Sequence, residues 1–174
     1  MSKAFTKEDD AGDVLVPRRV SPLPPGARNY LTRGGAARLR AELARLVEAE
    51  RPALLATTGE PGMRGAEAKE RLAHVEERIA YLEQSLRTAE ITPPPPAPHD
   101  TVRFGATVTV RNARGEEMTY RIVGVDEADH ARDEVSWLAP IARALLNARL
   151  GQRVPFRFPA GATQLEVVKI GYAD

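Results

Sequence analysis

Two stretches between Arg33 and Glu90 carry apolar residues at alternating intervals of three and four. This is the spacing of the buried seam of a coiled coil, because residues three and four apart lie on one face of a helix. A seam this narrow needs a partner stripe of equal width, so we expect each stretch to supply it for the other. The seam residues are Ala36, Leu39, Leu43, Leu46 and Ala53 in the first stretch, interrupted at Glu50, and Ala68, Leu72, Val75, Ile79, Leu82, Leu86 and Ala89 in the second.

The nine residues from Thr57 to Gly65 include three glycines and one proline. Such residues end helices and permit a tight reversal, so the sequence predicts an antiparallel helical hairpin. Arms of about 25 residues would each span ~37 Å at helical rise, more than the diameter of a small domain. In the first arm we expect Thr32 to cap the helix and Pro52 to bend it or begin a new turn.

Five prolines fall among the seven residues 92–98, which is typical of a semi-rigid extended spacer. Beyond the spacer the apolar residues alternate with a period of 2, which indicates strands. We expect a five-stranded antiparallel sheet with one short helix, and hence an α+β fold for the chain. The expected strands are 107–111, 118–123, 134–137, 154–158 and 164–170, and the helix, opened by Pro140, is 141–146.

The predicted organisation is therefore a flexible tail (1–28), a coiled-coil hairpin (29–91), a proline-rich linker (92–98) and a C-terminal domain (99–174). The core of that last domain should consist of the inward-facing apolar residues of its strands and helix. These are Val108, Val110, Ile122, Val135, Trp137, Ile141, Leu145, Leu146, Phe156, Leu165, Val167 and Ile170.

Composition argues against several classes of protein. The chain has no cysteine, which excludes a disulfide scaffold, a thiolate nucleophile and a cysteine zinc site. It has no apolar run of membrane-spanning length and its N-terminus lacks a signal-peptide core, so we expect a soluble, cytoplasmic protein. The net charge is +1, and the hairpin holds ten basic and ten acidic residues, which disfavours direct DNA binding along it.

The usual signs of an active site are missing from the sequence. His74, His99 and His130 have no second ligand at metal spacing, and neither a phosphate-binding glycine loop nor a nucleophile elbow is present. The acidic loop Asp126-Glu127-Ala128-Asp129 has too few ligands for a regular calcium loop, so we interpret it as an acidic contact surface or a solvated turn. We expect a recognition module rather than an enzyme.

Several longer segments resemble one family. They are residues 26–32, 39–43, 50–52, 104–110, 120–129 and 139–146, of which the block from Gly105 to Leu146 is the most specific. Together they look like the bacterial GreA/GreB transcription elongation factors. The opening residues 2–10 and the Arg28-Asn29-Tyr30 signature are most similar to the GreB branch.

The resemblance implies a coiled-coil finger and an FKBP-like C-terminal domain that docks at the rim of the secondary channel of RNA polymerase. The finger would enter the channel toward the catalytic magnesium, so that contact with nucleic acid is indirect and catalysis belongs to the polymerase. The rim contacts implied are Asp126, Glu127 and Asp129 of the acidic loop, and the segment from Ser136 to Ala142, which includes Pro140.

The tip of the finger departs from the family pattern. Cleavage-competent members carry two tip carboxylates that help to hold a second Mg²⁺, since hard cations prefer oxygen ligands. Here Glu60 takes the place of the first, but the second meets Met63 or Arg64, and a cation opposes a metal. The tip segment is also roughly eight residues shorter, about four per arm, which removes ~6 Å of reach. We therefore expect a polymerase-binding regulator that does not stimulate transcript cleavage, with no cofactor unless its tip reaches the polymerase Mg²⁺.

Three alternatives remain open at this stage. Glu60 together with Glu67 could recreate a weaker carboxylate pair, which would make the chain a cleavage factor. An FKBP-like domain could be a prolyl isomerase, but that activity needs a concave ring of aromatics and the aromatics here fall at core positions. A structural coiled coil would dimerise through its seam, whereas an intramolecular hairpin should be an elongated monomer.

Overall fold

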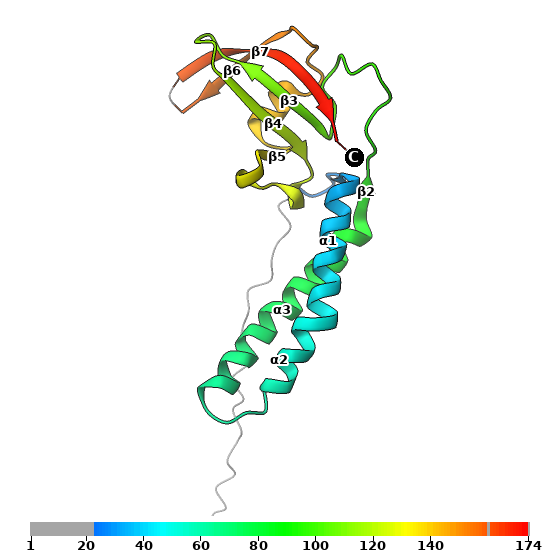
Figure 1. Cartoon of the computed structure of the whole chain (residues 1–174), viewed down its shortest axis with the longest axis vertical. Helices are drawn as coiled ribbons and strands as arrows, with labels where there is room; N and C mark the ends of the chain where they lie inside the picture. The colour runs from blue at the N-terminus through cyan, green and yellow to red at the C-terminus, as the bar shows by residue number, and fades with distance from the viewer. Residues whose placement is uncertain (1–22, 160, 174) are drawn as a thin grey trace, which may run out of the picture.

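The computed structural model describes residues 23–159 and 161–173, so most of the predicted tail lies outside the described residues. Figure 1 shows a long helical arm below a twisted sheet. The N-terminal elements are β1 (Asn29–Leu31), α1 (Arg33–Arg45), the π-helix η1 (Leu46–Glu50), α2 (Arg51–Thr57), α3 (Met63–Thr88) and β2 (Ala89–Ile91). The C-terminal elements are β3 (Ala106–Arg111), β4 (Glu117–Val123), the 3-10 turns η2 (Val125–Glu127) and η3 (His130–Arg132), β5 (Glu134–Ser136), α4 (Pro140–Leu145), β6 (Arg153–Phe158) and β7 (Gly161–Tyr172).

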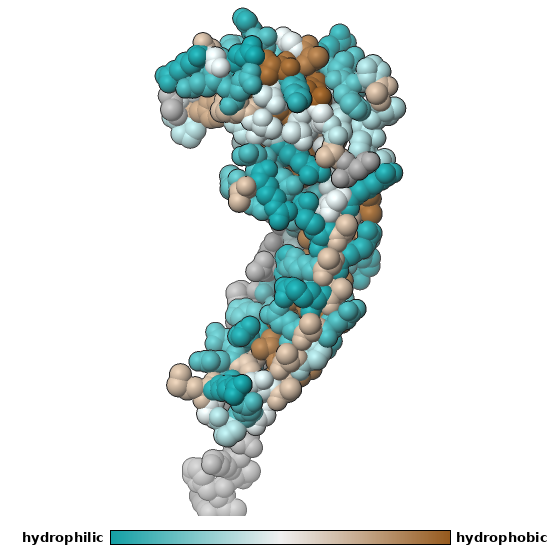
Figure 2. Space-filling view, viewed as in Figure 1, coloured by the Kyte–Doolittle hydropathy of each residue, from teal (hydrophilic) through white to brown (hydrophobic). Residues whose placement is uncertain are grey.

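The arm consists of α1, η1 and α2 on one side and α3, which runs back antiparallel, on the other (Figure 1). Its buried residues follow the predicted seam along α3 and the first half of the other side. They are Leu31, Ala36, Leu39, Leu46, Leu54, Ala68, Val75, Ile79 and Leu82. The outer surface of the arm is mostly hydrophilic, apart from a narrow pale stripe (Figure 2). The narrow seam thus suffices for two helices and leaves the rest of the arm to solvent.

The seam prediction is wrong at Ala53, which is exposed, while its neighbour Leu54 is buried. The cause is the π-helical segment η1, where the N–H of Arg51 donates to the carbonyl of Leu46, five residues back. One extra residue in a helical turn rotates everything after it by about 100°, so the buried face moves on by one position. Pro52 lies in the first turn of α2, so the prediction that it begins a new turn is confirmed.

Thr32 caps α1 as predicted, because its hydroxyl accepts a hydrogen bond from Gly35 N at 2.9 Å. At the reversal, α3 begins at Met63, earlier than the glycines suggested. Gly62 holds the turn with a φ of +83°, and Gly65 is buried within the first turn of α3. A Cβ on Gly65 would lie 2.0 Å from the carbonyl oxygen of Glu60, so the close crossing of the turn requires a glycine there.

The helix ends at Thr88 and does not run on to Glu90, so Ala89 packs against the arm core, as predicted, but from β2 and not from a helix. Instead β2 leaves α3 and pairs in parallel with β1, with Asn29 opposite Ala89 and Leu31 opposite Ile91. Thr92 N then donates to Leu31 O at 2.9 Å. A pairing of three residues has no period to read, so the two-stranded sheet could not be predicted from the sequence.

The C-terminal sheet has the order β5-β4-β3-β7-β6. The pairs β3–β4, β3–β7 and β6–β7 are antiparallel, but β4 and β5 are parallel, so the prediction of a wholly antiparallel sheet is wrong at this edge. The reason is the connection from Gly124 to Asp133, whose turns η2 and η3 carry the chain back to the start of the pairing. Arg121 consequently lies opposite Glu134, and Val123 opposite Ser136.

The core of the C-terminal sheet lies between its inner face and α4. Six predicted core residues are fully buried: Val108, Val110, Ile122, Leu145, Leu165 and Val167. The other six, Val135, Trp137, Ile141, Leu146, Phe156 and Ile170, pack against them and are partly buried. The prediction missed Val102, Ala106, Ala142, Ala148 and Val154, which complete the core.

Candidate functional site

Two regions of the chain hold the residues that the sequence singles out. The first is the tip, residues 58–64 at the free end of the arm (Figure 1). Glu60 is exposed and its carboxylate pairs with Arg64 Nε at 3.3 Å. Met63 is 79% exposed at the start of α3. The tip therefore presents a thioether and a guanidinium beside its single carboxylate.

The tip offers a cation little to bind. Glu67 is exposed on α3, and the described residues contain no group of three or more histidine, aspartate or glutamate side chains that could hold a metal ion. The structure brings together Glu60 and Arg64, a charge pair that neutralises the carboxylate. Mg²⁺ favours sites with several oxygen ligands, so a single carboxylate next to a guanidinium is a poor contributor.

The second region is where the arm meets the acidic loop, and we call it the joint. It consists of Thr32 and Gly35 at the start of α1, Gly124 just before the acidic loop, and Asp126 and Glu127 within that loop. The side chain of Glu127 is fully buried there. Its carboxylate accepts hydrogen bonds from Thr32 N at 2.9 Å, from Thr32 Oγ1 at 2.5 Å and from Gly124 N at 2.9 Å. A buried carboxylate needs this full set of donors, because an uncompensated one is strongly destabilising.

Asp126 also points into the chain rather than outward. Its carboxylate accepts hydrogen bonds from the hydroxyls of Tyr81 and Ser85, both on α3. Ser85 is in turn reached by the Asn29 amide, which donates to Ser85 O at 2.9 Å. The acidic loop thus contacts α1 through Glu127 and α3 through Asp126.

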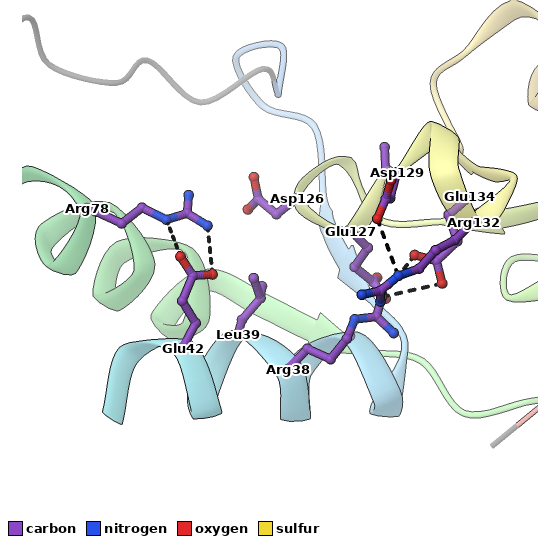
Figure 3. A pocket seen from close by; sticks show the side chains of 11 residues that line it. Arg38, Leu39, Glu42, Arg78, Asp126, Glu127, Asp129, Arg132 and Glu134 are labelled. Carbon is purple, nitrogen blue, oxygen red and sulfur yellow. Dashed lines mark hydrogen bonds and ion pairs between the residues drawn. The ribbon is translucent and has the colours of Figure 1, made fainter. Parts of the chain in front are cut away.

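A cleft of about 320 Å³ lies between the arm and the acidic loop (Figure 3). Most of its charged side chains are paired with one another, whereas Asp126 is bound by the two α3 hydroxyls. Arg78 binds Glu42 in a bidentate pair at 2.8 and 2.9 Å, and this hydrogen bonding raises the pKa of Arg78 above its ordinary value. The other pairs are Arg38 with Glu134 at 3.2 Å and with Glu127 at 3.9 Å, Arg121 with Glu134 at 3.4 Å, and Arg132 with Asp129 at 3.3 Å.

Aromatic side chains also pack between β1 and the C-terminal domain next to the joint. Tyr30 of β1 lies between Phe104 and Trp137, with ring centroids 5.6 and 5.4 Å apart. Such tilted and edge-on pairs are the favoured geometries for aromatic rings. This face of Trp137 and Phe104 is therefore occupied by the chain itself.

The residues predicted for the polymerase rim divide into two sets. The carboxylates of Asp126 and Glu127 accept hydrogen bonds from other residues of this chain. The prediction that the loop contacts the polymerase therefore now concerns only its outward side chains. Asp129 is half-buried and accepts a hydrogen bond from Ala131 N at 2.9 Å. Ser136 is half-buried with its hydroxyl accepting from Leu138 N at 3.2 Å, and Pro140 is exposed at the start of α4.

Sequence reasoning missed the joint, although one signal was present. Gly35 lies in the first turn of α1, where a glycine weakens a helix and needs another reason to be there. The reason is contact: a Cβ on Gly35 would lie 1.7 Å from Glu127 Oε1. The roles of Tyr81 and Ser85 had no such signal, since an exposed helix face carries both residue types routinely.

Known proteins resemble the chain over most of its length. A GreA from Anaeromyxobacter sp. (strain K) is 38% identical over 153 residues, covering 83% of this chain and 92% of that protein. The chain belongs to the GreA/GreB family of transcription elongation factors. A GreB from Neisseria meningitidis serogroup A is 35% identical over 154 residues, covering 83% of this chain and 94% of its own length. The family description "Transcription elongation factor, GreA/GreB, C-term" matches residues 97–172.

A solved structure, that of GreA factor homolog 1 of Thermus thermophilus, is also similar to this GreA/GreB family chain. It is 24% identical and covers 83% of this chain and 99% of that one, with a TM-score of 0.39. Within the described part of the chain, no helix is both long enough and apolar enough to cross a bilayer.

Proposed function

We propose that this chain binds RNA polymerase at the rim of its secondary channel and inserts the arm as a coiled-coil finger, without stimulating transcript cleavage. Membership of the GreA/GreB family supports the choice of partner. On this proposal the chain acts as a monomer in the cytoplasm, contacts nucleic acid only through the elongation complex, and is not itself an enzyme. An FKBP-like surface on the C-terminal domain, with Asp129 and Pro140 on its outward side, would provide the docking face.

The observation that carries the proposal is the charge pair at the tip. The only acidic side chain among residues 58–64 is Glu60, and its carboxylate lies 3.3 Å from the guanidinium of Arg64. A second Mg²⁺ beside the scissile phosphate needs oxygen ligands in fixed positions, and a ligand displaced by even 1 Å loses much of its effect. A tip with one neutralised carboxylate and reduced reach would occupy the channel without delivering a metal.

A transcript-cleavage assay on backtracked elongation complexes tests this proposal. We expect the chain to bind core polymerase at micromolar concentration, to leave the cleavage rate unchanged, and to compete with a family member that carries the full acidic tip. Cleavage that matches such a factor would overturn the proposal and favour Glu60 with Glu67 as the metal-holding pair.

Two variants separate the causes. Arg64→Gln removes the competing cation and Arg64→Glu adds a second carboxylate, both at an exposed position outside the arm core. If the lost acid alone is responsible, Arg64→Glu gains cleavage activity; if reach also matters, it stays inactive until each helix of the arm is lengthened by about one turn. Glu117→Gln, on the exposed sheet surface, is the matched control and should change neither binding nor cleavage.

A further inference from the structure

The acidic loop joins both helices of the arm to the C-terminal sheet. We propose that Glu127 is a positioning residue: its buried carboxylate fixes the direction of the arm relative to the sheet, and thereby determines where the tip lies. The inference rests on the proposed function in one respect only, namely that the tip acts inside the polymerase channel. The positioning itself is a property of the free protein.

Two of the three hydrogen bonds to Glu127 tie Thr32, at the start of the arm, to the loop, and the third lies within the loop segment. Thr32 donates both its N–H and its hydroxyl, at 2.9 and 2.5 Å, and Gly124 of the loop donates at 2.9 Å to the same carboxylate. Thr32 Oγ1 meanwhile accepts from Gly35 N, so the cap of α1 and the link to the loop share one hydroxyl. If the start of α1 moves away from the loop, the buried carboxylate of Glu127 loses both of the hydrogen bonds that Thr32 donates.

Two glycines make this approach possible, one from each side. A Cβ on Gly35 would lie 1.7 Å from Glu127 Oε1, and a Cβ on Gly124 would lie 2.2 Å from Tyr30 O. Contacts this short leave no room for any side chain. Gly124 therefore packs against the backbone of β1, the backbone of Gly35 packs against the Glu127 carboxylate, and the carboxylate fits a space that only glycines leave open.

The preceding residue of the loop, Asp126, holds the other helix. Asp126 accepts from Tyr81 and Ser85 of α3, so consecutive carboxylates engage the two antiparallel helices. Two attachments on separate helices resist rotation of the arm, whereas one would act as a pivot. The neighbouring cleft adds Arg38, which reaches Glu134 at 3.2 Å and Glu127 at 3.9 Å (Figure 3).

The length of the arm makes the joint angle important. At helical rise the 26 residues of α3 span about 39 Å, so a rotation of ~10° at the joint moves the tip by ~7 Å. A displacement of that size exceeds the length of a side chain. Contacts at the base therefore control the tip more strongly than substitutions within the arm.

The experiment measures the arm angle in the full-length protein without polymerase. The chain has no cysteine, so Lys69→Cys near the tip and Arg114→Cys on the β3–β4 turn supply a unique spin-label pair on exposed sites. We expect a narrow distance distribution in this background. Glu127→Ala should broaden or shift it by several ångströms, because Thr32 N and Gly124 N lose their acceptor.

Glu127→Gln is the conservative variant and should restore a narrow distribution. Its amide oxygen can accept from Thr32 N and Gly124 N, and its NH₂ can donate to Thr32 Oγ1. Glu117→Ala is the matched control, since it removes an ion pair with Arg111 that lies wholly within the sheet, and should leave the distances unchanged. A folded Glu127→Ala protein with the parental distribution, or a Glu117→Ala protein that broadens equally, would overturn the proposal.

If circular dichroism shows that Glu127→Ala does not fold, the variant Asp126→Ala tests the proposal in the same spin-label experiment. It removes the attachment to α3 and leaves the Glu127 contacts in place, so we expect a smaller broadening in the same assay. An unchanged distribution in that folded variant would refute the role of the loop. The spin-label experiment contains no polymerase, so its result does not depend on whether the chain binds polymerase. Polymerase binding and cleavage are tested separately, by the transcript-cleavage assay described above.

Discussion

The joint and the tip use the same residue types in opposite ways. At the joint, Glu127 is buried among three hydrogen bonds and Gly35 and Gly124 leave no space for a Cβ. At the tip, Glu60 is exposed with one ion-pair partner, and a Cβ on Gly59 would meet nothing within 4 Å. Dense packing constrains the joint, whereas most tip positions can change at little cost in stability. Substitutions should therefore be tolerated better at the tip than at the joint.

The largest contrast should come from the apolar core at the base of the arm. Leu82 is fully buried about one turn before Ser85, whereas Leu55, near the tip, is 50% exposed. Leu82→Ala should lower the free energy of unfolding by about 2–5 kcal/mol, because it removes transfer energy and leaves a cavity. Leu55→Ala should change it by less than about 1 kcal/mol. Urea denaturation followed by circular dichroism measures both, and equal losses would contradict the contrast.

The glycines provide a second, smaller contrast. Gly124→Ala places a Cβ 2.2 Å from the backbone oxygen of Tyr30, which cannot move aside cheaply. We expect a loss of about 1–3 kcal/mol from such overpacking. Gly59→Ala has open space around it and should stay within about 0.5 kcal/mol of the parent. Urea denaturation followed by circular dichroism measures both variants. If Gly124→Ala does not lower the free energy of unfolding, the joint is less tightly packed than the structure indicates.

Ion pairs should give the smallest contrast. Glu42 and Arg78 form a bidentate, half-buried ion pair across the arm. A double-mutant cycle with alanine should give this pair a coupling energy of about 1 kcal/mol. Glu60 and Arg64 form an exposed pair at i,i+4, for which we expect about 0.3–0.5 kcal/mol. Raising the salt concentration should weaken the second pair more than the first. Equal coupling energies would mean that the tip is as well ordered as the base.

Much of the architecture was predictable from short-range patterns. The heptad from Ala68 to Leu86 predicted α3, the cap at Thr32 was correct, and Pro140 opens the short helix as expected. All five strands of the C-terminal sheet lie within three residues of their predicted bounds. Each of these features depends on residues fewer than ten positions apart, which is the range that periodicity and capping describe.

Two of the errors share one physical cause. The β1–β2 pair and the parallel strand β5 depend on contacts with distant segments, whereas the π-helical turn that exchanges Ala53 for Leu54 is a local insertion that the heptad spacing does not reveal. Local propensity is a weak prior that such contacts override. For the candidate site, the sequence identified the exposed tip residues, but placed Glu127 on a contact surface when its side chain is buried.

By itself the sequence determined the two helices, the strands and a tip in which Glu60 is the single carboxylate among residues 58–64, because each depends on neighbouring residues. Only the tertiary structure decided that Glu127 joins the arm to the sheet. Thr32 and Glu127 are 95 positions apart, and their hydrogen bond depends on two glycines and a crossover that bring the loop against the start of α1. No local pattern contains such a contact, since it exists only once both units have folded and packed together.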